Sequence, residues 1–195
     1  MIYTIGHSNH PIERFIALLR QHEITAVADV RSTPYSRFNP QFSREPLKKS
    51  LTDAAIHYVY LGEELGARSK DRACYDAGRV NFHKLAQTEL FKQGLERLRT
   101  GMTQYKIALM CAEKEPLDCH RTILVTRELV RQGIPVTHIL DSGELELHDA
   151  ALARLRERLD LPAEDLFRSQ AELIEAAYDL QAGSIAYVEP TPNTR

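Results

Sequence analysis

The residues best suited to chemistry lie in one short segment near the middle of the chain. From Cys111 to Arg121 the sequence reads CAEKEPLDCHR and holds two cysteines, a histidine and an arginine as well as acidic residues. An apolar run ends at Cys111 and a helical pattern begins at Asp118, so the segment joins a strand to a helix. With Asp118 as the N-cap, Cys119 takes the first helical position, where free amides and the helix dipole favour a thiolate.

Three interpretations of the cysteines stay open. In the first, Cys119 is a nucleophile, and His120 or Glu113 carries the proton. In the second, Cys111 and Cys119 bind a metal ion with one or more histidines, although their separation of eight residues is unlike the usual spacing of about two to four in zinc sites. In the third, both cysteines only pack in the interior. Because of this spacing we expect no stoichiometric metal, and Cys111 and Cys119 are only weak candidate ligands.

Anion binding is a further role for the same segment. The free amides at the start of the helix favour a phosphate or carboxylate, and Arg121 offers paired donors to the same group. We therefore place Arg121 among the ligand-binding residues.

Polar residues also follow the other apolar runs that predict strands. Because ligands bind outside the carboxyl ends of the strands in open parallel sheets, we expect a functional site at this edge. Asp29 is costly to bury alone, so it should pair with Arg31, either as a structural ion pair or as a catalytic acid or base. In order of the strands, the residues at their ends are His7 and Ser8, then Asp29, Arg31 and Ser32, then Glu63 and Glu64, then Cys111 and Glu113, and finally Asp141, with His138 inside the last strand.

The loop RSTPYSRFNPQ that follows the second strand is basic and aromatic. Over residues 31–44, arginines at 31, 37 and 44 alternate with Tyr35, Phe38 and Phe42. This composition is typical of a surface that contacts phosphates and stacks on bases, and Tyr35 is a candidate ligand-binding residue. A surface loop anchored by its aromatic side chains is the alternative.

Alternating strand and helix patterns predict the fold. We expect strands at 2–5, 24–30, 56–61, 106–110 and 136–140, with helices between them and a long, charged binding loop at 62–80. The fold class is α/β, a three-layer, open, mainly parallel sheet of about five strands, Rossmann-like, with a C-terminal helical extension. We expect a core domain at 1–149, a helical cover packed on it at 150–189, and a flexible tail at 190–195.

Composition narrows the class of protein. The chain has 195 residues, 43% of them hydrophobic and 27% charged, which fits one globular domain. No stretch reads as a membrane span or signal peptide, and three cysteines are too few for a disulfide framework, so we expect a cytoplasmic protein without a membrane partner. Charge is segregated, because residues 31–79 carry nine Lys or Arg against six acids while 141–179 carry eleven acids against four Arg.

Several motifs match a known family in order. They are Thr4-Ile5-Gly6-His7-Ser8, Asp29-Val30-Arg31 with Pro34 and Ser36, Leu61-Gly62, Cys111-Ala112-Glu113, Cys119-His120-Arg121 and the late segment 185–188. On these motifs the chain resembles the bacterial domain-of-unknown-function 488 family over nearly its whole length. The resemblance implies a compact α/β domain with a shared polar site, and it carries no settled activity.

Two classes of function follow from these residues. The first is a Cys-dependent hydrolase or transferase that acts on a phosphate-containing ligand such as a nucleotide or nucleic acid. The alternative is a non-catalytic nucleic-acid-binding module built on residues 31–44, or else a Cys/His metal-binding protein. The sequence specifies neither cofactor nor oligomeric state, nor whether the ligand is DNA, RNA or free nucleotide. The enzyme hypothesis assigns catalysis to Cys119, His120, Glu113 and Asp29, and ligand binding to His7, Ser8, Arg31, Ser32, Tyr35 and Arg121.

Overall fold

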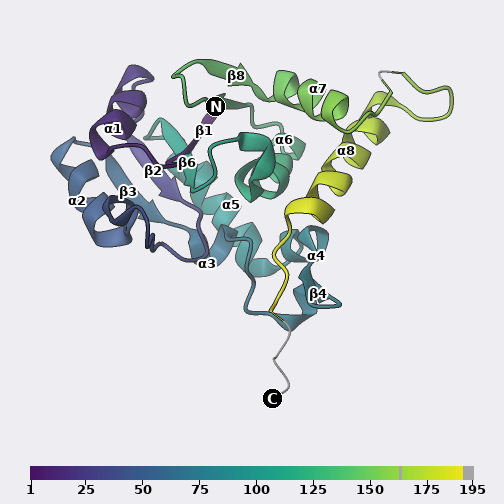
Figure 1. Cartoon of the computed structure of the whole chain (residues 1–195), viewed down its shortest axis with the longest axis horizontal. Coiled ribbons are helices and arrows are strands. Elements are labelled where there is room, and N and C mark those ends of the chain that lie inside the picture. The colour runs from purple at the N-terminus through teal and green to yellow at the C-terminus, as the bar shows by residue number, and fades with distance from the viewer. Residues whose placement is uncertain (163, 191–195) are drawn as a thin grey trace.

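A computed structural model describes residues 1–162 and 164–190 of the chain (Figure 1). Within these residues a six-stranded sheet has the order β3-β2-β6-β1-β7-β8. Its last strand, β8 (Leu145–Leu147), pairs antiparallel with β7 at one edge. The α/β class with a mainly parallel sheet is therefore confirmed. The parallel strands are β1 (Ile2–Gly6), β2 (Ala26–Asp29), β3 (His57–Tyr60), β6 (Ile107–Cys111) and β7 (Val136–Ile139).

The position of each strand explains its composition. All residues of β2 and β6 are buried, because helices cover both faces of the sheet there, and both strands accordingly read as continuous apolar runs. The edge strand β3 reads HYVY and has no fully buried residue. β6 lies between β1 and β2, whereas the classic dinucleotide-binding order places the first strand beside the second.

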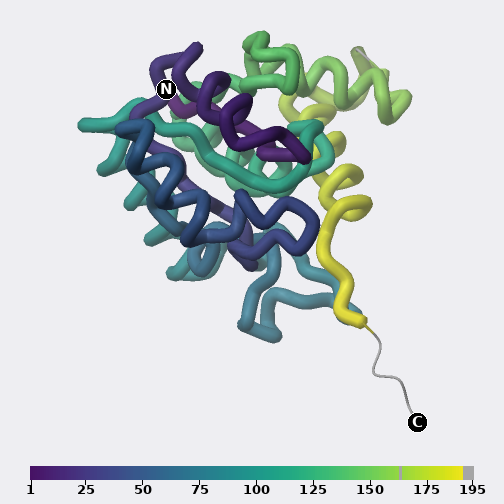
Figure 2. Tube along the Cα trace, turned by 60° about the vertical axis from the view of Figure 1, so that its left-hand side comes forward, coloured from purple at the N-terminus to yellow at the C-terminus, as the bar shows by residue number. Residues whose placement is uncertain are grey.

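Helices form a layer on each side of the sheet. In Figures 1 and 2, α1 (Ile12–Gln21) and α2 (Arg44–Asp53) lie together on one side, and α8 (Gln170–Ile185) lies apart from them. Phe15 and Leu47 pack with Val27 of the sheet in one buried cluster. Leu98 of α5 (Glu89–Gly101) and Leu155 of α7 (His148–Arg158) pack in a second cluster, together with α6 (Arg127–Arg131). Each cluster joins one layer of helices to one face of the sheet, and together they give the three predicted layers.

The segment expected as one loop at 62–80 contains short elements. It includes α3 (Gly62–Leu65), a 3-10 turn at Arg72–Cys74, and a hairpin of β4 (Tyr75–Asp76) and β5 (Arg79–Val80). Ala77 and Gly78 at its tip have φ of 47° and 78°, as a tight hairpin turn requires. Two helices follow the hairpin, because α4 (Phe82–Ala86) ends before Thr88, whose side chain caps α5.

The C-terminal helices pack on the sheet and the chain then returns to the hairpin. Tyr178 of α8 lies in the same buried cluster as Leu109 of β6. After α8, Val188 bridges to Arg79 and the Glu189 amide donates to the Gly78 carbonyl at 2.8 Å (Figure 1). The expected cover thus begins at α7, although its separation from the core at residue 149 stays a prediction. Of the expected tail, residues 191–195 lie outside the described residues.

The helices are short compared with a bilayer. α8 has 16 residues. No helix in the described ranges combines the length and the apolar composition that a membrane span requires.

Candidate functional site

A cavity of about 440 Å³ opens at the carboxyl ends of three neighbouring strands, β2, β6 and β1. The chain leaves β2 towards β3 and leaves β6 towards β7, so the connections diverge here, as they do at ligand-binding crevices of open α/β sheets. A larger hollow of about 690 Å³ lies beside α5, but its surface is mainly apolar. The polar cavity is therefore the candidate site. It is lined by His7, Arg31, Ser32, Thr33, Tyr35, Ser36, Ala67, Arg68, Cys111, Ala112, Glu113, Asp118, His120, Ile185 and Tyr187.

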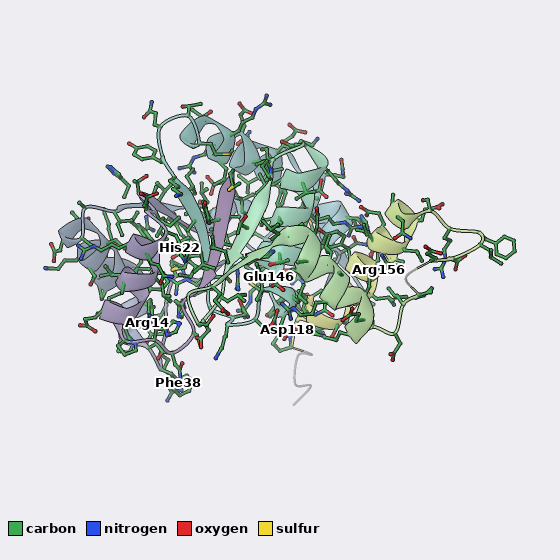
Figure 3. The ribbon with its side chains drawn as sticks, turned by 90° about the horizontal axis from the view of Figure 1, so that it is seen from above. Arg14, His22, Phe38, Asp118, Glu146 and Arg156 are labelled. Atoms are coloured by element: carbon green, nitrogen blue, oxygen red, sulfur yellow. The ribbon has the colours of Figure 1, made fainter. Side chains whose placement is uncertain are left out.

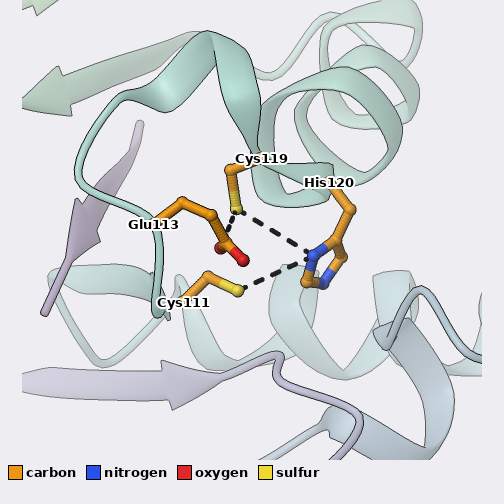
Figure 4. Close-up of side chains that lie close together, drawn as sticks. All are labelled: Cys111, Glu113, Cys119 and His120. Carbon is orange, nitrogen blue, oxygen red and sulfur yellow. Dashed lines mark hydrogen bonds between the residues drawn. The ribbon is translucent and has the colours of Figure 1, made fainter. Parts of the chain in front are cut away.

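Four side chains form a cluster beside this cavity, and three of them, Cys111, Glu113 and His120, line its wall (Figure 4). Cys119 Sγ lies 2.9 Å from Glu113 Oε2 and 3.9 Å from His120 Nδ1. Cys111 Sγ, at the end of β6, lies 3.6 Å from the same Nδ1. One ligand atom from each residue lies within 4.8 Å of the others. The strand end and the helix start thus bring both cysteines to one imidazole nitrogen. We call Cys111, Glu113, Cys119 and His120 the CECH cluster.

The helix after this loop begins one residue later than predicted. Cys119 has φ −132° and ψ 139°, and its carbonyl accepts the amides of Thr122 and Ile123 at 3.0 and 3.1 Å. Cys119 is therefore the N-cap itself, and its Sγ accepts the Arg121 amide at 3.4 Å. The expected cap, Asp118, instead ends a 3-10 turn and pairs with Arg158 of α7. The helix start therefore still favours a thiolate at Cys119, which now acts from the N-cap position.

The first turns of that helix are π-helical, at Arg121–Thr126. The Thr126 hydroxyl donates to the Arg121 carbonyl, five residues earlier, at 2.8 Å and supports the wider turn. π-Helical turns are rare in proteins, and those that do occur are often found at functional sites. Sequence periodicity does not reveal this turn, because its apolar residues also fit an α-helix.

The environment changes the proton affinity of each group in the CECH cluster. Burial by itself would raise the pKa of Cys119, but the hydrogen bond with Cys111 and the charge of Arg121 hold it well below its ordinary value. Burial raises the pKa of Cys111 and of Glu113. Burial opposes protonation of His120, yet the contact with Cys119 raises its pKa. Of the two cysteines, Cys119 is therefore the one that holds negative charge more readily.

Asp29 and Arg31 form a buried ion pair behind the cavity. Arg31 Nε and Nη2 lie 2.9 and 2.7 Å from the two Asp29 oxygens, and the Tyr58 hydroxyl donates to Asp29 at 2.8 Å. Arg31 also contacts His7 Nε2 at 3.1 Å and the Phe42 carbonyl at 2.8 Å. Burial lowers the pKa of His7 to about 4, so it accepts from Arg31 as a neutral ring. Asp29 is not in the cavity wall and holds Arg31 in position, so its expected catalytic role stays a prediction.

Two expected ligand-binding residues point elsewhere. Arg121 is 1% exposed, and its guanidinium donates to the carbonyls of Glu113 and Lys114 at 2.7 and 3.2 Å, so it holds the loop and is absent from the cavity wall. Ser8 has φ 47°, and its amide donates to the Ala112 carbonyl at 3.0 Å. Its role is to fasten the first turn to the same loop.

Other expected residues line the cavity, and two more join them. Ser32 accepts the Arg68 amide at 2.9 Å, and Tyr35 is largely exposed at the rim. Arg68 was not predicted as a site residue, although it lies in the expected binding loop, and its guanidinium stacks on Tyr187 at 4.5 Å. Arg68 has no acidic partner among the described residues. Tyr187 belongs to the segment 185–188 that carries the family resemblance, and no pattern in the sequence indicates on physical grounds that it reaches the site.

The aromatic loop presents less surface than expected. Phe42 is fully buried in the core and stacks on His7, and Arg44 lies over the Tyr60 ring. Phe38 is 88% exposed and lies at the edge of the molecule (Figure 3). Of the alternating set, Phe42 is therefore withdrawn from any ligand, whereas Arg31 lines the cavity and Tyr35, Arg37 and Phe38 are exposed.

Comparison with known proteins places the chain in a family. The model of the family described as "Domain of unknown function DUF488" matches residues 11–127, more than half of the chain. The chain belongs to the DUF488 family. The match to the DUF488 model includes the CECH cluster but neither His7 nor the segment at 185–188, so it is shorter than the resemblance predicted. No curated protein and no solved structure matches the chain.

Proposed function

We propose that this DUF488 protein is a cytoplasmic enzyme, a hydrolase or transferase, that acts on a small phosphate-containing ligand bound in the polar cavity. One observation carries the proposal: three members of the CECH cluster, Cys111, Glu113 and His120, line the same cavity as two arginines, Arg31 and Arg68, at the carboxyl ends of adjacent strands. Perturbed nucleophilic and acid–base groups gathered in one cleft are typical of active sites. The three free, buried cysteines support a reducing compartment.

The arginines supply the attraction for the phosphate. Bonds to Asp29, His7 and Phe42 use four of the five hydrogens of the Arg31 guanidinium, which leaves one on Nη1. Arg68 carries a charge that no acid among the described residues offsets. A phosphate between these groups would receive charge-assisted hydrogen bonds from both sides.

The aromatic rings favour a ligand with a planar portion. Tyr35 and Tyr187 both line the cavity, and Tyr187 already stacks on Arg68. A base or similar ring would stack on such side chains, with gains of about 1–3 kcal/mol per ring. A mononucleotide offers a phosphate together with a planar ring.

Isothermal titration with AMP, adenosine and inorganic phosphate tests the binding step. We expect AMP to bind more tightly than adenosine, with an affinity that falls as salt rises. Arg68→Ala should weaken AMP binding about tenfold or more, because it removes a charged donor. Arg99→Ala is the matched control, since Arg99 is exposed on α5 and is not part of the cavity wall. If none of the three probes binds the wild type at low salt, the proposal is wrong.

Turnover is tested separately from binding. The wild type is incubated with a panel of mononucleotides and a short oligonucleotide, and products are identified by chromatography and mass spectrometry. We expect Glu113→Gln to retain binding and lose turnover, because Glu113 is the acid–base group that lies on the cavity side of the cluster. Binding of the oligonucleotide through Arg37 and Phe38, without any product, would instead support a non-catalytic module.

A further inference from the structure

We propose that Cys111, Cys119 and His120 bind a zinc ion, and that Glu113 occupies an exchangeable fourth position on the cavity side. The inference rests on the proposed function, because it names the reactive group of the same site. It also reverses the expectation of no metal that residue spacing alone suggested.

The two sulfur–nitrogen distances in the cluster are close to those of a tetrahedral zinc site. Bonds of about 2.3 Å to sulfur and 2.0–2.1 Å to nitrogen place a sulfur and a nitrogen ligand about 3.6 Å apart. The two cysteine sulfurs lie 3.6 and 3.9 Å from His120 Nδ1. Glu113 Oε2 is closer to Cys119 Sγ, at 2.9 Å, as a hydrogen-bonded pair is. Three protein ligands are thus in place, and the carboxylate has to move only slightly to become the fourth.

The orientation of His120 is that of a metal ligand. Its Nε2 lies 3.0 Å from the Val30 carbonyl, which only accepts, so the proton resides on Nε2. In the neutral ring this leaves the lone pair on Nδ1, the atom that faces both sulfurs. A backbone carbonyl on the second ring nitrogen is the usual support for a ligating histidine, because it fixes both tautomer and direction. The sheet therefore presets this ligand before any ion binds.

The buried charges balance when a divalent ion is present. Arg121 is buried and has no acidic partner among the described residues, so its positive charge needs compensation nearby. Two thiolates and the Glu113 carboxylate together carry three negative charges. Arg121 supplies one positive charge, and a divalent ion supplies the other two. Without the ion, at least one of the thiols or the carboxyl has to be protonated.

Burial distinguishes a ligand from a nucleophile. Cys119 is 1% exposed and is absent from the cavity wall, whereas Cys111 is 3% exposed and lines it. A nucleophile must be reached by substrate, while a metal ligand need only reach the ion. The ion would then be the group that faces the cavity.

The unusual spacing has a structural cause. Short spacings of two to four residues are typical of ligands on one tight turn. Here one ligand ends a strand and the others begin a helix, and the loop between them is held by Arg121 and by close packing on Gly6. Two thiolates with an imidazole favour zinc over magnesium or calcium, and three protein ligands with an exchangeable fourth are the pattern of catalytic zinc sites.

Elemental analysis of protein purified without chelator tests the assignment. We expect one zinc per chain in the wild type and a loss to trace levels in Cys111→Ser, Cys119→Ser and His120→Gln. Cys74→Ser is the matched control, because Cys74 is equally buried but lies outside the cluster, and it should keep its zinc. Circular dichroism establishes that each variant is folded.

A second measurement on the wild type does not depend on the variants. The protein is stripped of metal and split, one half is reloaded with Zn²⁺, and both are treated with iodoacetamide under mild denaturant. Peptide mapping should show zinc-dependent protection of Cys111 and Cys119 but not of Cys74. Reloading with Co²⁺ should give the absorption bands of a tetrahedral thiolate site.

The outcomes separate this inference from the proposed function. Absence of zinc together with equal labelling in both halves would overturn the metal site; AMP binding would then leave the proposed function standing without a metal ion. Stoichiometric zinc without binding of any phosphate probe would keep the metal site and remove the proposed function.

Discussion

His138 Nε2 lies 3.0 Å from His148 Nδ1 in the buried interior. The contact belongs to a chain of polar groups, in which the Thr4 hydroxyl lies 2.8 Å from His138 Nδ1 and the Tyr178 hydroxyl contacts His148 Nε2. It links β1 and β7 to α7 and α8, so a polar relay, and not apolar packing alone, joins the C-terminal helices to the sheet.

These buried histidines should make the protein sensitive to acid. Burial lowers the pKa of His148 to about 4 and that of His138 well below 6.5, so the unfolded chain binds protons that the folded one does not. Below about pH 6.5, stability should therefore fall as pH falls, by up to about 1.4 kcal/mol per pH unit for each such histidine. Urea unfolding between pH 7.5 and 5 measures this slope. It should be shallower in His148→Gln, and an equal slope in both proteins would contradict the assignment.

The Tyr178 hydroxyl should contribute measurably to stability. Tyr178→Phe keeps the ring but leaves His148 Nε2 without its partner in the interior, at an expected cost of about 1–3 kcal/mol. Tyr105→Phe serves as the control, because no described residue hydrogen-bonds to the Tyr105 hydroxyl. Urea unfolding at pH 7.5 compares the two variants, and similar small losses would argue against the relay.

A buried and an exposed aspartate ion pair should differ sharply in their contribution to the free energy of unfolding. Asp29 is fully buried against Arg31, so Asp29→Ala leaves a buried guanidinium uncompensated and should cost about 3–5 kcal/mol. Asp53 pairs with Lys49 on the surface, and Asp53→Ala should cost less than about 1 kcal/mol. Chemical denaturation of both variants gives the ratio. A small loss of stability in Asp29→Ala would mean that water reaches Arg31 freely.

Gly6 should be required for the shape of the site. A Cβ at this position would lie 1.9 Å from the Glu113 carbonyl oxygen, and backbone cannot yield as a side-chain tip does. Gly6→Ala should thus displace the loop of the CECH cluster, lower thermal stability and reduce zinc content. Gly183→Ala on α8 meets no atom within 4 Å and should be neutral or stabilising by up to about 1 kcal/mol. Unchanged metal content in Gly6→Ala would show that the loop tolerates the shift.

Sequence patterns predicted the sheet better than the site. Apolar runs located β2 and β6 because buried parallel strands need no alternation. Their order was not predictable, since the insertion of β6 between β1 and β2 depends on pairing between residues far apart in the chain. The short β8 was missed because only three residues pair there.

Within the site, residue type predicted location but not direction. Cys111 and Glu113 were expected at a strand end and His120 at the start of the following helix, and all three line the cavity. Arg121 points to backbone carbonyls because the loop before the helix leaves them unpaired, and no sequence pattern reports the direction of such carbonyls. The position of Arg68 in the cavity wall and the distances within the CECH cluster likewise depend on tertiary packing.

The return of the chain to the β4–β5 hairpin affects how the protein is made. The cavity has walls from His7, near the beginning of the sequence, and from Ile185 and Tyr187, beyond α8. During translation the ribosome releases His7 long before Tyr187, so a nascent chain passes most of its synthesis with this pocket open on one side. Ligand capture during synthesis should therefore be suppressed until the C-terminal segment has emerged and docked.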